Sequence, residues 1–190
     1  MTGEHELSVR PRSDDDLDDL VTVLHRVQAA TGYPVQMPPD PARWLSSSRT
    51  RESWVAVYRG GPIAGQVSLA TSDGDFATDL WTRALECSPS EIAVVKRLFV
   101  DPPMSGRGAA RLLLGTAVSE AHRQGLVPVL DVDASSERAR LLYERSGFRL
   151  VGTKELTWSG LGHSFRAACY VGPPPPVPPV PKGPPPALRD

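Results

Sequence analysis

The chain has 190 residues, a formal net charge of −1 at pH 7 and 40% hydrophobic residues. This length suits one domain with a sizeable core and is short for two ordinary domains. The balance of 21 basic and 22 acidic residues argues against a general affinity for nucleic acids or anionic membranes, because neither sign dominates the long-range field. We therefore expect neither a nucleic acid nor a membrane as a partner.

Targeting signals and cysteine chemistry are not indicated. The first twenty residues contain five Asp and no apolar stretch, so we expect no secretory signal. No apolar run approaches the roughly 18 residues of a membrane span. The two cysteines, Cys87 and Cys169, have neither the spacing of a metal site nor the density of a disulfide scaffold. A cytoplasmic protein without a bound metal is the expectation.

Proline divides the chain into three expected parts. Half of the 20 prolines lie in residues 173–186, where they deprive the backbone of the donors that a helix or sheet needs. We expect a flexible N-terminus over 1–7, a folded domain over 8–172 and a disordered or polyproline II tail over 173–190. The tail is either a ligand for a proline-binding domain or a solvated extension.

The first half of the domain predicts a strand, a helix and a hairpin. Residues 7–11 are typical of a short strand, and Ser13 with three following Asp residues predicts a helix start. Residues 34–50 are rich in Pro and predict irregular chain with a short helix near Trp44. Strands over 53–59 and 63–69 flank a Gly-Gly turn, and residues 70–91 favour no single structure. The expected helix has apolar residues at helical spacing and ends before Gly32: Leu17, Leu20, Val21, Leu24 and Val27.

The second half predicts alternating strands and helices. Residues 92–100 (IAVVKRLFV) form a strong strand signal, and a helix follows over about 109–124. A strand over 127–133, a helix that begins after Ser135 or Ser136, and two strands near 148–158 and 165–171 complete the order. This order predicts a mixed α/β fold with helices on the faces of the sheet. The inward face of the helix over 109–124 is expected to consist of Ala110, Leu113, Leu114, Ala117, Val118 and Ala121.

The strand, turn and helix over 94–124 carry the chemical signal. Gly106 and Gly108 alone also occur in ordinary turns, but here they stand between an apolar strand and the start of a helix. The first N–H groups of a helix lack intrahelical partners and favour anions, and Arg107 and Arg111 add donors suited to phosphate oxygens. No Gly-Lys-Ser/Thr sequence or third Rossmann glycine is present. The segment predicts a diphosphate site of another kind.

Two segments resemble a known family. Residues 100–114 (VDPPMSGRGAARLLL) are similar to the acyl-CoA-binding motif Arg/Gln-x-x-Gly-x-Gly/Ala of the GCN5-related N-acetyltransferases. Residues 129–148 (VLDVDASSERARLLYERSGF) resemble the later Ala-x-x-Leu-Tyr-Glu-x-x-Gly-Phe motif of that family. The resemblance is specific over 92–152 and extends in layout over 8–158. It implies an acyl-CoA N-acyltransferase-like fold, with a mostly antiparallel central sheet flanked by helices on both faces, and acetyl-CoA as co-substrate.

The resemblance also implies roles for individual residues. The backbone of Leu98, Phe99 and Val100 would pair with the pantetheine arm, and Tyr143 would protonate the departing thiolate. Ser105 stands where the family has Arg or Gln, which removes a long donor, and Ser136 stands where Asn is frequent. The N–H groups for the diphosphate would come from Gly106, Arg107, Gly108, Ala109, Ala110 and Arg111.

Amide formation requires a proton acceptor, because an alkyl amine with a pKa near 10.4 is neutral in only about one molecule in two thousand at pH 7. Asp131 lies twelve residues before Tyr143, the spacing of a Glu in family members that act on protein N-termini, and Asp133 is the reserve candidate. Asp131 is otherwise a solvated strand residue or an ion-pair partner, and Tyr143 is otherwise a core tyrosine. Lys96 and Arg97 either border the cofactor or acceptor cleft or are exposed strand charges.

The function favoured by these features is transfer of acetyl from acetyl-CoA to a primary amine of a small molecule, peptide or protein, by direct attack in a ternary complex. A catalytically silent acyl-CoA-binding or regulatory module is the alternative, and a scaffold that displays the Pro-rich tail is a third. Residues 28–50 and 70–91 would set acceptor specificity, and Tyr33, Trp44 and Trp81 are candidates for an aromatic cleft. The chain is expected to be a monomer or a homodimer.

Overall fold

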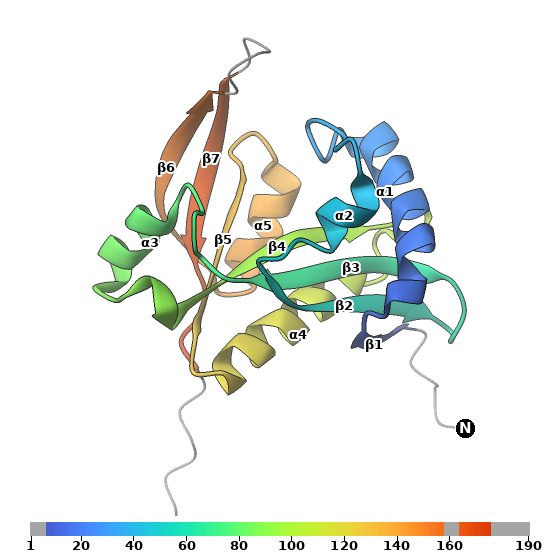
Figure 1. Ribbon diagram of the computed structural model, residues 1–190, viewed down its shortest axis with the longest axis horizontal. Coiled ribbons are helices and arrows are strands. Elements are labelled where there is room, and N and C mark those ends of the chain that lie inside the picture. Colours follow the sequence, from blue (N-terminus) through green and yellow to red (C-terminus); the bar gives the residue numbers. More distant parts are fainter. Residues whose placement is uncertain (1–6, 158–163, 176–190) are drawn as a thin grey trace, which may run out of the picture.

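A seven-stranded mixed sheet forms the centre of the protein (Figure 1). The structure, a computed structural model, describes residues 7–157 and 164–175. The strand order is β1-β2-β3-β4-β5-β7-β6, and every neighbouring pair is antiparallel except β4 with β5. The strands are β1 (Leu7–Pro11), β2 (Thr50–Tyr58), β3 (Ile63–Ala70), β4 (Ile92–Val100), β5 (Val127–Asp133), β6 (Arg149–Thr157) and β7 (Ser164–Val171).

Helices cover both faces of this sheet. On one face, α4 packs with Tyr143 of α5 into a large apolar cluster that also contains Ala93 and Val95 of β4. On the other face, α1 packs over Phe99, and Trp81 of α3 packs over Val94. The fold class expected from the sequence is therefore confirmed. The helices are α1 (Leu17–Thr31), α2 (Pro41–Leu45), α3 (Thr78–Leu85), α4 (Ala109–Arg123) and α5 (Glu137–Arg145), with 3-10 turns at Asp14–Asp16, Pro89–Glu91 and Pro102–Met104.

Two local expectations are refined by the structure. The segment 70–91, which favoured no single structure, contains α3, and its Trp81 is fully buried. In α4 the buried alanine of the first turn is Ala109, whereas Ala110 is only half-buried. Ala109 continues the buried row of Leu113, Ala117 and Ala121 at intervals of four residues, which places it on the same face of the helix.

The ends of the chain are described only in part. The expected flexible N-terminus over 1–7 overlaps the described residues only at Leu7, and the expected tail over 173–190 overlaps them only at 173–175. Most of both expectations therefore lies outside the described residues. Within the described ranges, no helix combines the length and the apolar character that crossing a membrane requires.

The sheet opens between β4 and β5. These two strands pair only from Ile92 to Val94 and from Val127 to Val129. Beyond this point β4 remains paired with β3, while β5 remains paired with β7 as far as Asp133. The two strands consequently diverge, as Figure 1 shows, and their facing edges have backbone groups that no neighbouring strand of the described sheet uses.

Candidate active site

The turn between β4 and α4 presents a row of free backbone donors. Gly106 and Gly108 have φ values of 81° and 87°, a left-handed conformation that glycine adopts without a steric penalty. In the described part of the chain, no hydrogen bond uses the N–H groups of residues 106–111, and the first bond of α4 runs from Leu112 N to Gly108 O at 3.0 Å. A helix start of this kind binds anions through its unpaired N–H groups and its dipole.

Charged side chains surround this turn. Arg107 Nη1 donates to Tyr58 Oη at 3.0 Å, and its guanidinium lies 5.0 Å from the centre of the Tyr58 ring. Arg111 is exposed and borders two surface hollows, of about 740 Å³ and about 610 Å³. Ser105, at the family's Arg/Gln position, is also exposed. The turn therefore has Arg111 as its available cation, while Arg107 rests against β2.

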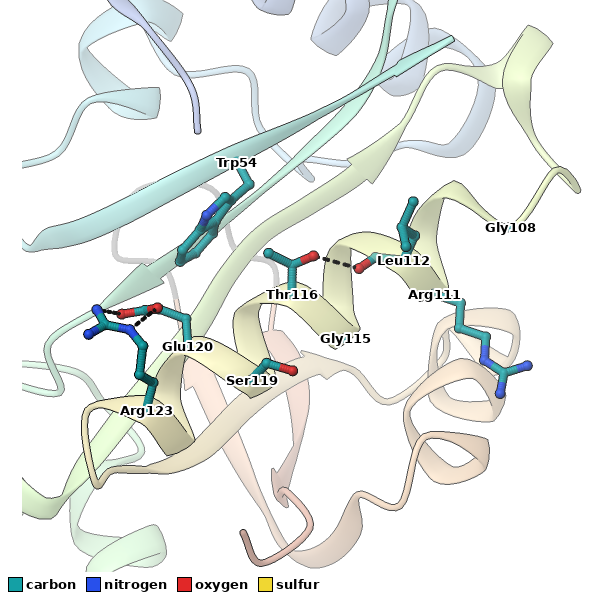
Figure 2. A pocket seen from close by; sticks show the side chains of 9 residues that line it. All are labelled: Trp54, Gly108, Arg111, Leu112, Gly115, Thr116, Ser119, Glu120 and Arg123. Atoms are coloured by element: carbon teal, nitrogen blue, oxygen red, sulfur yellow. Dashed lines mark hydrogen bonds and ion pairs between the residues drawn. The ribbon is translucent and has the colours of Figure 1, made fainter. Parts of the chain in front are cut away.

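The larger hollow lies beside α4 and away from the divergence of β4 and β5. Figure 2 shows its lining, which runs along α4 from Gly108 to Arg123 and includes Trp54 of β2. None of its lining residues belongs to β4 or β5. Despite its size, this hollow is therefore not where we expect the reaction. Only one of its ends reaches the glycine turn.

An ion pair fixes the beginning of the turn. The buried carboxylate of Asp101 accepts hydrogen bonds from Arg26 Nε at 2.9 Å and Arg26 Nη2 at 2.7 Å. The backbone of Asp101 also donates to Ala64 O and accepts from Met104 N, both at 2.8 Å. One residue thus ties α1, β3 and the turn together. Sequence reasoning missed this role, although the Asp-Pro-Pro sequence marked a break at this point.

Tyr143 projects from α5 into the apolar cluster that α4 shares with β4 and β5. Its ring lies 5.9 Å from that of Phe148 and 6.3 Å from that of Tyr170, measured between centroids. Its hydroxyl has no hydrogen-bond partner among the described residues. Burial raises the pKa of the Tyr143 phenol, and the charges of Tyr33 and Asp131 raise it further. Tyr143 thus keeps its proton at neutral pH and has a hydroxyl available to a ligand.

Asp131 belongs to a three-charge group on the opposite face. Its Oδ1 lies 2.5 Å from Lys96 Nζ, and Asp75 Oδ2 lies 2.9 Å from the same nitrogen. Desolvation lowers the pKa of Lys96, but the charges of Asp131 and Asp75 outweigh it and the pKa is raised overall. Of the two alternatives for Asp131, the geometry is that of an ion-pair partner, and the group has a formal charge of −1.

A β-bulge sets the direction of Arg97. Gln66 pairs with Phe99 and Ser68 pairs with Lys96, so that two residues of β4 oppose only one of β3. Arg97 has a φ of 53° at this bulge, an uncommon conformation for a non-glycine residue. Its guanidinium lies 4.8 Å from the centre of the Trp44 ring, and its Nη1 donates to Thr50 Oγ1 at 3.3 Å.

The remaining expected residues lie in three places. Leu98 and Val100 pack toward α4, whereas Phe99 is buried beneath α1. Ser136 precedes α5, and its N–H donates to Asp133 O at 2.9 Å. The Asp133 carboxylate accepts from the N–H and hydroxyl of Ser135, so the reserve base candidate holds a turn instead of joining Lys96.

The fold and the site together define a class of protein. A sheet that opens at its one parallel pair, beside a helix with free N–H groups, is the architecture of the N-acyltransferase fold. In the solved structures, Escherichia coli ribosomal-protein-S18-alanine N-acetyltransferase matches with a TM-score of 0.64 at 18% identity, over 88% of this chain and 93% of that chain. Arabidopsis thaliana NAA60 in complex with acetyl-CoA matches with a TM-score of 0.66 at 20% identity, over 87% and 97%.

The sequence comparison identifies the family. Residues 20–148 match the acetyltransferase (GNAT) family, and the chain belongs to it, which confirms the resemblance seen in the two motifs. The mycothiol acetyltransferase of Propionibacterium freudenreichii subsp. shermanii is 31% identical over 143 residues, which cover 74% of this chain and 42% of that protein. The chain thus spans less than half the length of this relative.

Proposed function

We propose that this protein is an acetyl-CoA-dependent N-acetyltransferase that acts on a primary amine of a small molecule or peptide by direct attack in a ternary complex. Membership of the GNAT family supports the reaction class. The observation that carries the proposal is the row of free N–H groups at residues 106–111 beside the divergence of β4 and β5. A diphosphate on these donors would direct an attached thioester arm along β4.

The turn fits an acyl-CoA on the features that the structure describes. A Cβ added to Gly106 or Gly108 would meet no other atom within 4 Å, so the backbone there is accessible to a ligand. Gly106 to Arg111 would bind the diphosphate, and Arg111 would add a charged donor. The free edge of β4 around Leu98 and Val100 would pair with the pantetheine amides. Acetyl-CoA supplies the thioester carbonyl that the amine attacks.

Three groups of the chain then serve the transfer. The amine nitrogen forms a bond to the carbonyl carbon, and the carbon–sulfur bond breaks. Asp131, whose Oδ1 is occupied by Lys96, accepts the amine proton on Oδ2, and N–H groups on the free edge of β4 stabilise the oxyanion. Tyr143 gives its proton to the thiolate. A single general acid or base typically contributes about 10²–10⁴ in rate.

One observation favours a second function. Ser105 cannot reach phosphate oxygens as the family's Arg or Gln does, and it is exposed at the corner of the turn. Without this long donor the diphosphate would be held less firmly, and a loosely positioned thioester would react slowly or not at all. The alternative is thus a catalytically silent acyl-CoA-binding or regulatory module.

The two functions are separated by two measurements on the full chain. Acetyl-CoA at 100 times its Kd is expected to stabilise the fold by about 2.7 kcal/mol in thermal unfolding. A panel of primary amines is then assayed for release of the CoA thiol. Stabilisation with amine-dependent thiol release supports the enzyme, and stabilisation without release for any amine supports the silent module. No stabilisation by acetyl-CoA would contradict both.

A further inference from the structure

Two consecutive cations of β4 lie on the same face of the sheet. Residues of a strand normally alternate between faces, but the bulge interrupts this alternation between Lys96 and Arg97. Lys96 contacts Asp75 of the loop before α3, and Arg97 contacts Trp44 of α2. Both α2 and α3 lie on the face opposite to α4 (Figure 1). The acceptor side of the site therefore has two neighbouring charged groups.

The two cations differ in how their charges are balanced. Lys96 is paired with two carboxylates, which leaves its group with a formal charge of −1. Arg97 forms no ion pair within the described residues, and its buried Nε has no hydrogen-bond partner there. Its contacts are a tryptophan ring and a hydroxyl. A partly buried guanidinium without an anion is costly unless a ligand supplies one.

Neighbouring arginines strengthen the positive field at Arg97. Arg12 donates to Leu45 O at 2.8 Å, and Arg49 donates to Asp73 O at 2.9 Å. Both of these acceptors are neutral oxygens, while the carboxylates of Asp14 and Asp16 lie within electrostatic range of Arg12. Desolvation lowers the pKa of Arg97, and the charges of Arg12 and Arg49 lower it further, while Tyr33 raises it. The guanidinium groups of Arg12 and Arg49 thus lie within electrostatic range of Arg97. An oxyanion at Arg97 would relieve the repulsion among them.

Tyr33 adds an aromatic ring beside Trp44, the residue that Arg97 contacts. Tyr33 has 36% of its surface exposed. Desolvation of its phenol raises the pKa of Tyr33. The charge of Arg97 lowers this pKa, and the charge of Asp131 raises it. Its ring lies 6.4 Å from that of Trp44. The acceptor side thus presents negative charge at Asp131, an aromatic surface, and positive charge at Arg97.

We propose that the acceptor is a small amine that also carries a carboxylate or another oxyanion, and that Arg97 binds the oxyanion while the amine lies beside Asp131. This inference rests on the proposed function and names the substrate class. Lys96 and Arg97 are consecutive in β4 and lie on the same face of the sheet, which favours a small acceptor that carries both charges. Arg97 is thus a specificity-determining residue, whose guanidinium matches an oxyanion in bidentate geometry.

The test compares acceptors that differ only in the oxyanion. Pairs of α-amino acids and their amides are assayed with acetyl-CoA and the full chain. The nearby carboxylate of the acid raises its amine pKa, so at neutral pH a larger fraction of the amide is present as the neutral, reactive amine. A kcat/KM at least about tenfold higher for the acid is expected from a charge-assisted contact, and equal or lower values for the acid would overturn the proposal.

The residue is tested by Arg97→Gln, with Arg97→Lys as the variant that keeps the charge. Arg97→Gln is expected to lower kcat/KM for the acid at least about tenfold more than kcat/KM for the amide, whereas Arg97→Lys keeps part of the preference. Arg51→Gln, at an exposed arginine of the same neighbourhood on β2, serves as the matched control and keeps the full preference. Equal losses for acid and amide in Arg97→Gln would contradict the proposal.

A binding measurement separates this inference from the proposed function. N-acetyl amino acids and their amides are titrated into the protein in the presence of CoA, which requires no turnover. Tighter binding of the acid, abolished by Arg97→Gln but not by Arg51→Gln, supports the inference even if no amine is acetylated. Equal binding of acid and amide would overturn it, whether or not the protein is an acetyltransferase.

Discussion

Tyr143 and Tyr170 lie in one aromatic group, but their hydroxyls meet different surroundings. Tyr170 Oη donates to Glu144 Oε1 at 2.9 Å and accepts from Arg140 Nε at 3.1 Å. The Tyr143 hydroxyl has no such partner in the described part of the chain and lies within electrostatic range of Asp131. Since the two residues share size, chemistry and burial, they form a matched pair for testing which hydroxyl serves the reaction.

Tyr143→Phe is expected to lower kcat at least about tenfold, the lower part of the range for general acid catalysis. The variant removes the proposed proton donor of the thiolate and keeps the ring. The Kd of acetyl-CoA, measured by titration, should change little because the proposed diphosphate donors are the free N–H groups of residues 106–111. Burial raises the pKa of Tyr143, so its deprotonation should cause no loss of kcat between about pH 7 and 9 in the wild type.

Tyr170→Phe is the control for this prediction. It removes the hydrogen bonds to Glu144 and Arg140, so it should lower the free energy of unfolding by about 1 kcal/mol and leave kcat close to the wild-type value. Wild-type turnover by Tyr143→Phe would eliminate the acid role. Equal losses of kcat in the two variants would point to packing instead of proton transfer.

At the scale of elements, the junction of β1 and α1 depends on Asp16. The Asp16 carboxylate accepts from Arg10 Nη1 at 2.7 Å and Arg10 Nη2 at 2.6 Å, and from the Ser13 N–H at 2.7 Å. These hydrogen bonds, above all those from Arg10, outweigh the effect of burial and lower the pKa of Asp16 from 3.8 to about 2. Ser13 was expected to cap a helix, and the structure shows Asp16 binding back to it.

Asp16→Asn is expected to lower the free energy of unfolding at pH 7 by about 2 kcal/mol, the value that corresponds to this pKa shift. Because the folded-state pKa is depressed, the stabilisation is present above about pH 4 and is lost as the pH falls toward about 2. Urea unfolding of both proteins between about pH 2 and 7 measures the difference. Asp14→Asn, at an exposed position of the same turn, is the control, and a pH-independent difference would contradict the ion-pair explanation.

Elements with a long periodic pattern could be predicted from the sequence, and shorter ones could not. The strand of β4 and the helix of α4 have apolar faces that persist over several turns or alternations. The helix α3 has only eight residues, too few for the periodicity to separate a helix from a loop, and it depends on the burial of Trp81. The position of α3 is therefore a product of tertiary packing.

The sequence can indicate a candidate site only where residues close together in the chain form it. The glycine turn and Tyr143 follow from local motifs, because a turn and a helix face need only adjacent residues. The pairing of Lys96 with Asp131 joins residues 35 positions apart, and the bulge at Arg97 depends on the register with β3. No local pattern in the sequence indicates either feature. The sequence therefore leaves two alternatives for Lys96 and Arg97, a position beside a cleft or an exposed position on the strand.

At the scale of the whole molecule, one ion pair connects elements from the two faces of the sheet. Arg26 on α1 and Asp101 before the glycine turn are 75 residues apart in sequence. α1 lies on the face that carries Arg97 and Asp131, whereas the turn leads into α4 on the other face. The Asp101 carboxylate is buried and Arg26 is half exposed, with side-chain exposures of 8% and 47%. We therefore expect the pair to fix the turn relative to the acceptor side.

Asp101→Asn is expected to lower the free energy of unfolding by about 1–3 kcal/mol, less than the loss of a fully buried pair because Arg26 remains partly solvated. A double-mutant cycle with Arg26→Met, measured by urea unfolding, should give a coupling energy of about 1 kcal/mol or more. If the pair also positions residues 106–111, each variant should weaken acetyl-CoA binding in titrations under conditions where it is fully folded. If the two substitutions have additive effects on the free energy of unfolding, the two residues are not coupled. If the affinity for acetyl-CoA is unchanged, the pair serves only to hold α1 against the sheet.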